Sequence, residues 1–223
     1  MFSSEVINMI YEGFWETIYM TLVSTALGYL IGLPLGITLA ITDRGGIKPN
    51  RVLYRILDVI SNIIRSVPFL ILLILIIPLT RFLVGKSYGS SATIVPLVIA
   101  AAPFIGRMVE SSLKEVDEGV IEAAKSMGAG TWTIIFRVLL VEARISLIVG
   151  MTIALGTILG YSAMAGVIGG GGLGDIAIRY GYYRYESEIM IVTIIILVII
   201  VQVLQALGMM ISCLLYTSPS PRD

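Results

Sequence analysis

The chain has 223 residues, of which 57% are hydrophobic and 13% are charged, and its 15 basic and 15 acidic side chains cancel. A soluble core cannot bury so much apolar surface, so the composition indicates a membrane protein. Histidine is absent, which excludes a histidine-ligated metal site and a histidine general base, and the zero net charge gives no reason to expect nucleic acid as a partner.

Uncharged runs predict the membrane spans, because about 20 apolar residues cross a hydrocarbon layer about 30 Å thick. Four runs contain no charge, and a fifth contains only Asp58 and Arg65. We expect an all-α membrane protein with five transmembrane helices in one domain, residues 1–215. The spans cover residues 17–42, 56–80, 87–106, 145–174 and 189–215.

Basic residues predict the orientation, because Lys and Arg in short loops stay on the cytoplasmic side. They gather between spans one and two and between spans three and four: Arg44, Lys48, Arg51, Arg55, Arg107, Lys114, Lys125, Arg137 and Arg144. The opposite side holds fewer: Arg81, Lys86, Arg179 and Arg184. The N-terminus is then outside and the C-terminus inside. No basic residue precedes Arg44, so the first span is expected to remain in the mature protein.

Small residues recur every four positions in the first span, at Gly28, Gly32 and Gly36, and again in the fourth, at Gly156 and Gly160. This spacing places each set on one helical face, where another backbone can approach closely. The partner is either another helix of the same chain or a second subunit.

Prolines predict that spans one to three are kinked or broken, because proline removes a helical hydrogen bond. These residues are Pro34, Pro68, Pro78, Pro96 and Pro103. Bent helices suit a transport path, although inert membrane proteins also contain them.

Arg65 is a basic residue set deep in an apolar context. At the bilayer centre it would be unfavourable by about 2.5–3.5 kcal/mol, which would mark it as functional. Alternatively, the second span begins near Ser66 and Arg65 reaches the cytoplasmic interface. Asp58 lies about two turns away in a straight helix, too far to be its direct partner.

The segment between spans three and four predicts two short amphipathic helices. The first has an apolar face made of Val116, Val120, Ala123, Ala124 and Met127, and the second has a stripe of Ile134, Ile135, Val138 and Leu139. Gly128 is placed to end the first helix and Thr131 to cap the second. We interpret the segment as a docking device for a cytoplasmic partner; the alternative is a helix lying at the lipid headgroups.

The glycine-rich run at residues 169–174 contains the letters of a dinucleotide fingerprint, but it follows a membrane span instead of a strand. We expect a flexible or tightly packed turn at the mouth of a translocation path.

The pattern Glu122-Ala123-Ala124, Gly128, Val138 and Leu140 resembles the EAA loop of ABC importer permeases. That family usually has proline where Val141 stands, which leaves the start of span four less sharply defined. The resemblance implies that the loop is a coupling helix seated in a cleft of the ATP-binding subunit, with Glu122, Ala123, Ala124 and Gly128 as the coupling contacts.

Four further segments resemble the methionine-uptake branch of this family, within a likeness that covers about residues 12–212. They are NIIRSVPFLILL (62–73), VPLVIAAAPFIGRMVE (95–110), GYSAMAG (160–166) and GGGGLGDIAIRYGYYRY (169–185). The resemblance implies a non-catalytic permease of the bacterial inner membrane that works by alternating access. Its partners would be a second copy of the chain, two ATP-binding cassette subunits and an external substrate-binding protein. ATP and magnesium would bind the partner subunit, and no cofactor this chain.

Tyr161, Ser162 and Met164 are candidates for the translocation path or its gate, although residues at that depth can equally fill a core. Other cargo within the same class, an amino acid or a small anion, stays open. So do a proton- or sodium-coupled secondary transporter and a membrane scaffold without transport activity. Residues 216–223 shift to turn-forming residues and are expected to be a non-native or disordered tail without function.

Overall fold

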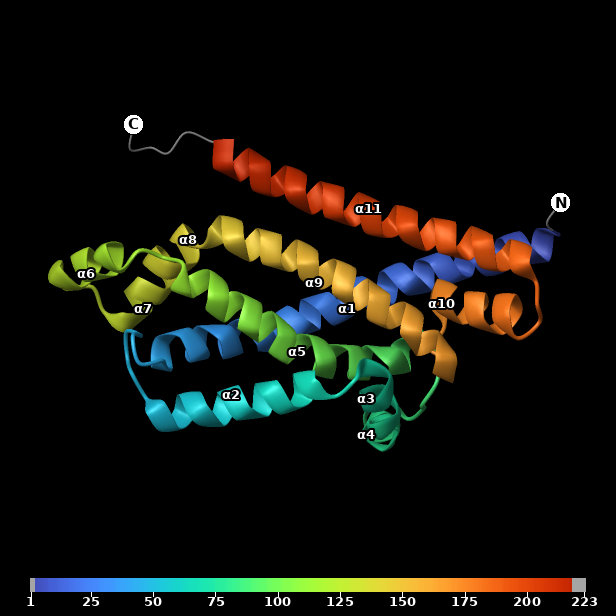
Figure 1. Ribbon diagram of the computed structural model, residues 1–223, viewed down its shortest axis with the longest axis horizontal. Coiled ribbons are helices and arrows are strands. Elements are labelled where there is room, and N and C mark those ends of the chain that lie inside the picture. Colours follow the sequence, from blue (N-terminus) through green and yellow to red (C-terminus); the bar gives the residue numbers. More distant parts are fainter. Residues whose placement is uncertain (1–2, 218–223) are drawn as a thin grey trace.

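Four long helices account for most of the molecule (Figure 1). The structure is a computed structural model that describes residues 3–217, and within this range every regular element is a helix. Helices α1 (Ser4–Thr42), α5 (Ser90–Lys114), α9 (Arg144–Met164) and α11 (Ser187–Thr217) each contain a stretch long and apolar enough to cross a membrane. The expected all-α membrane fold is therefore confirmed. The part of the predicted tail beyond Thr217 lies outside the described residues.

The second span is a broken helix. Helices α2 (Arg51–Ser66) and α3 (Phe69–Leu75) meet at 101°, and α4 (Ile77–Val84) follows directly. Pro68 explains the break, because proline cannot donate a backbone hydrogen bond and forces the residue before it out of the helical region. With α2 and α3 counted as one span, the described chain has the five spans that the sequence predicts.

The other predicted kink positions behave differently. Helix α1 continues through Pro34 and α5 through Pro96 and Pro103, whereas Pro78 lies in the first turn of α4. In that first turn the missing N–H costs nothing, because it would have no helical partner there. Among these prolines, Pro68 is therefore the one that separates two helices at a sharp angle.

Helices α1 and α5 pack at close range along the predicted glycine face. A Cβ on Gly32 would lie 2.8 Å from the carbonyl oxygen of Ala102, and one on Gly36 would lie 2.5 Å from that of Gly106. Gly106 returns the contact, because its Cβ would lie 2.9 Å from Leu35. Of the two interpretations of this face, packing within the chain is the one that the structure bears out.

The fourth span ends earlier than the sequence suggested. After α9, the 3₁₀ turn η2 (Ala165–Ile168) completes the span, and Gly169 leaves it with a left-handed φ of 74°. The glycine run then packs against α1: the N–H of Gly172 donates to Glu16 Oε2 at 2.7 Å and that of Leu173 to Thr17 Oγ1 at 2.9 Å. The turn is thus tightly packed, and it leads into α10 (Gly172–Ile176) and the π-helix η3 (Ala177–Tyr182).

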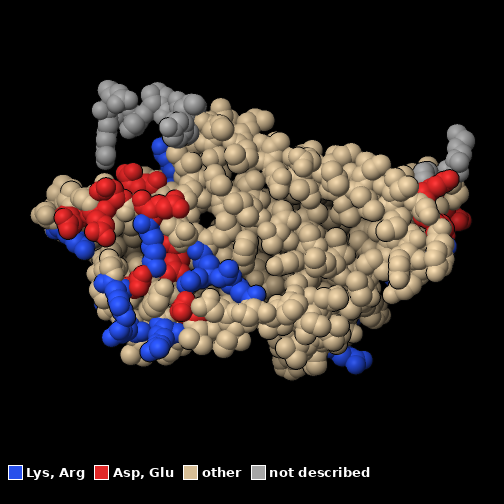
Figure 2. Space-filling view, viewed as in Figure 1, with Lys and Arg blue, Asp and Glu red and all other residues tan. Residues whose placement is uncertain are grey.

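The loop between the third and fourth spans forms one end of the molecule. It contains α6 (Glu118–Ser126), α7 (Thr131–Thr133), the π-helix η1 (Ile134–Leu139) and α8 (Leu140–Glu142). The last described turns of α11 lie at this same end, and the first turn of α1 lies at the opposite end (Figure 1). Figure 2 shows that charged side chains crowd the α6 end, while the middle of the visible face is almost free of charge.

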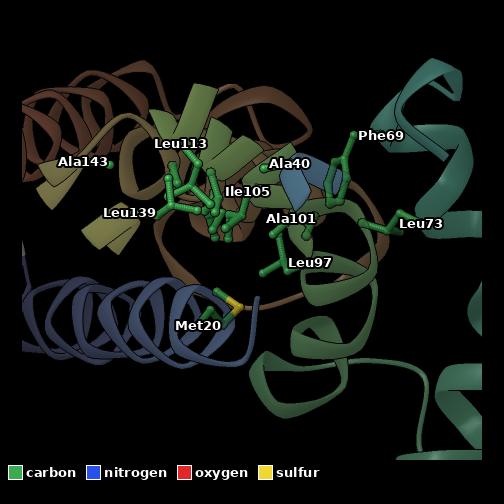
Figure 3. Close-up of a cluster of buried hydrophobic side chains, with 14 of the residues drawn as sticks. Met20, Ala40, Phe69, Leu73, Leu97, Ala101, Ile105, Leu113, Leu139 and Ala143 are labelled. Atoms are coloured by element: carbon green, nitrogen blue, oxygen red, sulfur yellow. The ribbon is translucent and has the colours of Figure 1, made fainter. Parts of the chain in front are cut away.

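A continuous apolar cluster links this loop to the broken span (Figure 3). Leu139 and Ala143 from the loop belong to the same cluster as Leu113 on α5, and the cluster continues along α5 to Phe69 and Leu73 on α3. All five residues are at most 8% exposed. The loop is therefore packed against the transmembrane core and shares its apolar cluster.

Candidate functional site

Helix α6 has defined ends. The side chain of Asp117 caps its start by accepting a hydrogen bond from the N–H of Gly119 at 2.7 Å. At its other end Gly128 adopts a left-handed φ of 80°, and the N–H of Ala129 donates to the carbonyl of Ala124 at 3.0 Å. A left-handed residue after the last helical turn is the usual place for glycine, so the predicted helix stop at Gly128 is confirmed.

Ala124 and the second half of the loop anchor α6 to the core. Ala124 is 4% exposed and belongs to the same cluster as Leu113 and Leu139. Ile134, Ile135 and Leu139 are all buried, as the predicted stripe requires, with Val138 packed beside them. The predicted cap is wrong, however: Gly130 precedes α7, and Thr131 is its first residue without capping it.

The expected apolar face of α6 does not turn inward as a unit. Ala124 is buried and Val116 partly buried, but Val120 is 37% exposed, Met127 is 82% exposed and Ala123 faces solvent. Ile121, which the periodicity did not select, packs against the core in their place. The helix thus buries one narrow edge and leaves an apolar edge open.

Two aromatic side chains extend this open surface. Trp132 is 74% exposed and Phe136 is 56% exposed, and their rings stack with centroids 5.9 Å apart. Exposed apolar side chains gathered in one place are typical of a protein or membrane contact. The sequence analysis did not select these two residues, although their four-residue spacing just off the buried stripe could have identified them.

The residues expected to couple the loop to a partner lie together on α6. Glu122 and Ala123 are exposed, whereas Ala124 is buried beneath them. Glu122 also lines a groove of about 430 Å³ between α6 and the segment that follows α1, together with Lys125 and Asp43. These positions leave Glu122 and Ala123 available to a partner and give Ala124 and Gly128 a structural part.

A buried carboxylate joins three helices behind the loop. Glu110 on α5 has a side chain only 5% exposed and binds Arg107 at 2.7 Å and Lys114 at 2.7 Å. From α2, Tyr54 donates a hydrogen bond to Glu110 at 3.2 Å, and Asp58 pairs with Arg107 at 2.9 Å. Asp58 is therefore a partner of Arg107, and not of Arg65.

The end of α1 joins the same network. Lys114 Nζ lies 2.6 Å from Asp43 Oδ2, directly after the last turn of α1. The hydrogen bond from Lys114 lowers the pKa of the Asp43 carboxyl, against the opposing effect of its partial burial. This contact keeps Asp43 ionised and ties α1 to α5 close to the groove beside α6.

The three candidate path residues have different surroundings. Ser162 is 1% exposed and donates to the carbonyl of Leu159, so it belongs to the packed interior, whereas Met164 is 49% exposed. Tyr161 stacks on Phe69 with ring centroids 4.4 Å apart and lines a cavity that Arg65 also lines. The structure thus brings together Tyr161 and Arg65, which sequence reasoning had treated separately.

Apolar spans joined by a firmly anchored helical loop with an exposed apolar edge are compatible with a membrane transport subunit. The family model described as "binding-protein-dependent transport system inner membrane component" matches residues 32–212. The chain belongs to this family, and it is therefore an inner membrane component of a transport system whose membrane subunit is not itself catalytic.

Several relatives are similar over nearly their whole length. A probable D-methionine transport system permease protein of Vibrio cholerae is 48% identical over 201 residues, which are 90% of this chain and 89% of that protein. A methionine import system permease protein of Bacillus subtilis is 45% identical over 92% of this chain and 93% of its own.

Solved structures agree with these relatives. A chain of the MetNI methionine ABC transporter in an inward-facing conformation is 47% identical, with a TM-score of 0.93 over 95% of this chain and 98% of that chain. An amino acid ABC transporter is 20% identical with a TM-score of 0.77 over 93% of this chain and 94% of that one, and shares the fold.

Proposed function

We propose that this chain is the permease subunit of an ATP-driven importer and that its cargo is methionine. The observation that carries the proposal is the likeness to the methionine transporter chain, at 47% identity and a TM-score of 0.93. At that identity and TM-score the two chains share one fold over 95% of this chain. A proton- or sodium-coupled transporter would need coupling-ion side chains at the membrane midplane, and nothing in the described residues favours one.

The proposed assembly contains two copies of this chain, two ATP-binding cassette subunits and an external binding protein. ATP and magnesium bind to the cassette subunits, and their closure moves the α6 loops and turns the permease outward. A nucleotide can shift such an equilibrium only through different affinity for the two states. The loop must therefore either hold the cassette subunit differently in the two states or transmit its motion as a rigid body, and its anchoring through Ala124 supports the second.

The orientation follows from the same assembly. If α6 meets a cytoplasmic ATPase, the start of α1 at the opposite end is outside the cell, and the last described turns of α11 are inside. The Lys and Arg side chains among the charges at the α6 end support this arrangement (Figure 2), since basic residues in short loops stay cytoplasmic.

The proposal assigns specific residues to the contact with the cassette subunit. Glu122 and Ala123 touch the cassette subunit, Ala124 holds α6 to the core, and Gly128 sets the angle of the turn that follows. Tyr161, with Met164, belongs to the translocation path, whereas Ser162 supports it from the interior.

We expect Glu122→Lys and Gly128→Pro each to abolish ATP-dependent methionine uptake while the protein still inserts into the membrane. Lysine reverses the charge that meets the partner, and proline cannot adopt the positive φ of Gly128. The measurement is uptake into proteoliposomes that contain the permease, its cassette subunit and its binding protein.

Glu142→Lys is the matched control, because Glu142 is exposed, lies on the same loop in α8 and carries the same charge. It should transport like the unaltered chain. Normal uptake by the Glu122 and Gly128 variants would show that these two residues do not couple the loop to the cassette subunit. Uptake that needs a proton gradient and no ATP would remove the proposed function itself.

A further inference from the structure

A small cavity lies where the broken span meets the rest of the bundle. It has a volume of about 240 Å³ and is lined by Arg65 and Phe69 at the break, by Ala100 and Phe104 on α5, and by Tyr161 on α9. Pockets for drug-sized ligands typically measure about 300–1,000 Å³. This cavity is therefore of a size for a smaller molecule, in the range of a single amino acid.

The walls of the cavity combine one cation with aromatic rings. Phe69 and Tyr161 lie nearly parallel, with an interplanar angle of 8° and ring centroids 4.4 Å apart, and Phe104 adds a third ring. Aromatic rings make favourable contacts with a thioether sulfur. A guanidinium binds carboxylates in a planar, two-pronged geometry.

Arg65 has no counter-ion of its own. Within residues 3–217 it forms no ion pair, whereas Arg107 and Lys114 on α5 both bind carboxylates. An unpaired arginine within a membrane span is unfavourable unless it serves a ligand or reaches polar surroundings. A binding site for an external anion accounts for both the charge and the cavity beside it.

We infer that Arg65 binds the α-carboxylate of the amino-acid cargo, while the Phe69–Tyr161 ring pair and Phe104 receive its side chain. This inference rests on the proposed function and adds to it a binding site inside the permease, separate from any site on a binding protein. The break at Pro68 contributes to this binding site. It places Arg65, at the end of α2, and Phe69, at the start of α3, on the same cavity.

A second hollow extends the site toward the α6 end. It has a volume of about 290 Å³, and its lining includes Arg65, Arg107, Ser111, Ser146 and Glu115. Arg65 and Phe104 line both the aromatic cavity and this hollow, whose walls also include Met108 and Ile153 and are more apolar than polar. Cargo that leaves the rings would pass from the cavity beside Arg65 into this hollow.

Cysteine protection tests the site directly and needs no binding protein. In a Cys213→Ser background, Ala100→Cys places a thiol in the cavity and Val59→Cys places one on the exposed face of α2. The permease–cassette complex is treated with a maleimide reagent in the presence of methionine or of methionine amide, which lacks the carboxylate. We expect methionine to slow labelling of the Ala100→Cys variant several-fold and the amide to leave it unchanged. Methionine should have no effect on labelling of the Val59→Cys variant.

Arg65→Gln, added to the Ala100→Cys variant, should abolish this protection, and Arg65→Lys should restore part of it. Arg55→Gln, at an exposed arginine on the same helix, should leave the protection unchanged. Protection that persists in Arg65→Gln, or equal protection by the amide, would overturn the carboxylate assignment. Labelling that methionine never alters would show that Arg65 serves a lipid phosphate or the interface instead.

Uptake measurements separate this inference from the function on which it rests. We expect Arg65→Gln to raise the methionine concentration needed for half-maximal uptake and to lower uptake at least tenfold, with cassette binding and ATP hydrolysis retained. Wild-type uptake by Arg65→Gln would overturn the cargo site and leave the importer intact. Loss of cassette binding would show a structural part for Arg65, and absence of methionine uptake by the unaltered chain would refute the proposed function.

Discussion

At the scale of single residues, glycines at the contact between α1 and α5 determine how closely the two helices approach, because glycine has no side chain. Between two helices in a membrane no hydrophobic driving force remains, because lipid tails are as apolar as leucine. Dispersion contacts between backbones therefore matter, and they require the space that Gly32, Gly36 and Gly106 leave open.

Gly36→Ala tests this packing. The added methyl group would meet the carbonyl of Gly106 at 2.5 Å and Val109 at 2.6 Å, so one helix must move. Overpacking of this kind costs about 1–3 kcal/mol. We expect a matching fall in the unfolding midpoint of the detergent-solubilised protein.

Gly160→Ala is the control for Gly36→Ala, because Gly160 has no neighbouring atom within 4 Å of its would-be Cβ. Alanine also favours the helix over glycine by about 0.5–1 kcal/mol. The midpoint of this variant should stay level or rise. Equal losses in both variants would show that helix α1 does not depend on close backbone contact.

At the scale of whole elements, Glu110 holds α1, α2 and α5 together at the α6 end. Its buried carboxylate binds Arg107, Lys114 and Tyr54 at once, and Asp43 and Asp58 bind the same two cations from the outside. The C-terminal end of α2 leads into the broken segment. The network therefore fixes the N-terminal half of α2, through Tyr54 and Asp58, to the bundle.

Glu110→Gln keeps the size of the side chain and removes its charge. Hydrogen bonds to charged groups contribute about 1.5–3 kcal/mol, and Arg107 and Lys114 each retain one carboxylate partner. We therefore expect a loss of about 1.5–3 kcal/mol, read from thermal unfolding, and faster protease cleavage near α2.

Asp175→Asn provides the comparison for Glu110→Gln, since Asp175, whose side chain is 14% exposed, pairs with one cation only, Arg179, which is 54% exposed and therefore screened by solvent. Exposed ion pairs contribute about 0–1 kcal/mol. A larger effect from Asp175→Asn than from Glu110→Gln would mean that the network on α5 does not hold α2.

The elements also show what sequence patterns could and could not predict. The glycine face of α1, the uncharged runs and the position of Gly128 depend on local spacing, and the structure confirms each of them. Gly160, in the second predicted pair, has no atom within 4 Å of its would-be Cβ. The inward edge of α6 was mispredicted, because a short helix with Val120, Ile121, Ala124 and Met127 has apolar residues on more than one side. Only packing against Leu113 and Leu139 determines which of them is buried.

The sequence allowed the loop of the candidate site to be predicted, but not its cavity. Glu122, Ala123 and Gly128 are close in sequence, so a motif can single them out, and their coupling role stays a prediction. Arg65 and Tyr161 line the same cavity next to the point where the chain bends by 101° after α2. The presence of Pro68 predicts a break, but the angle depends on the helices against which α3 packs.

At the scale of the whole molecule, the apolar cluster provides a continuous route from the loop to the cavity. It begins at Ala124 and Leu139 beneath α6, follows α5 through Ile105, and ends at Phe69, whose ring forms a wall of the cavity. Packed interiors shift between discrete arrangements instead of deforming smoothly. A displacement of α6 by a cassette subunit would therefore reach Phe69 as a change in packing.

Leu139→Ala tests whether this packing transmits the motion. Leu139 is 4% exposed, and its truncation should cost about 2–5 kcal/mol through the cavity it leaves. The exposed side chains of α6, Trp132 and Phe136 remain, so the cassette subunit should still copurify and hydrolyse ATP. We expect methionine uptake per ATP hydrolysed to fall several-fold, because α6 can then move without moving α5.

Leu30→Ala is the control, at a site 71% exposed, and it should keep the ratio of uptake to hydrolysis. If Leu139→Ala lowers stability and leaves that ratio unchanged, the motion travels through another contact, of which the network around Glu110 is the nearest.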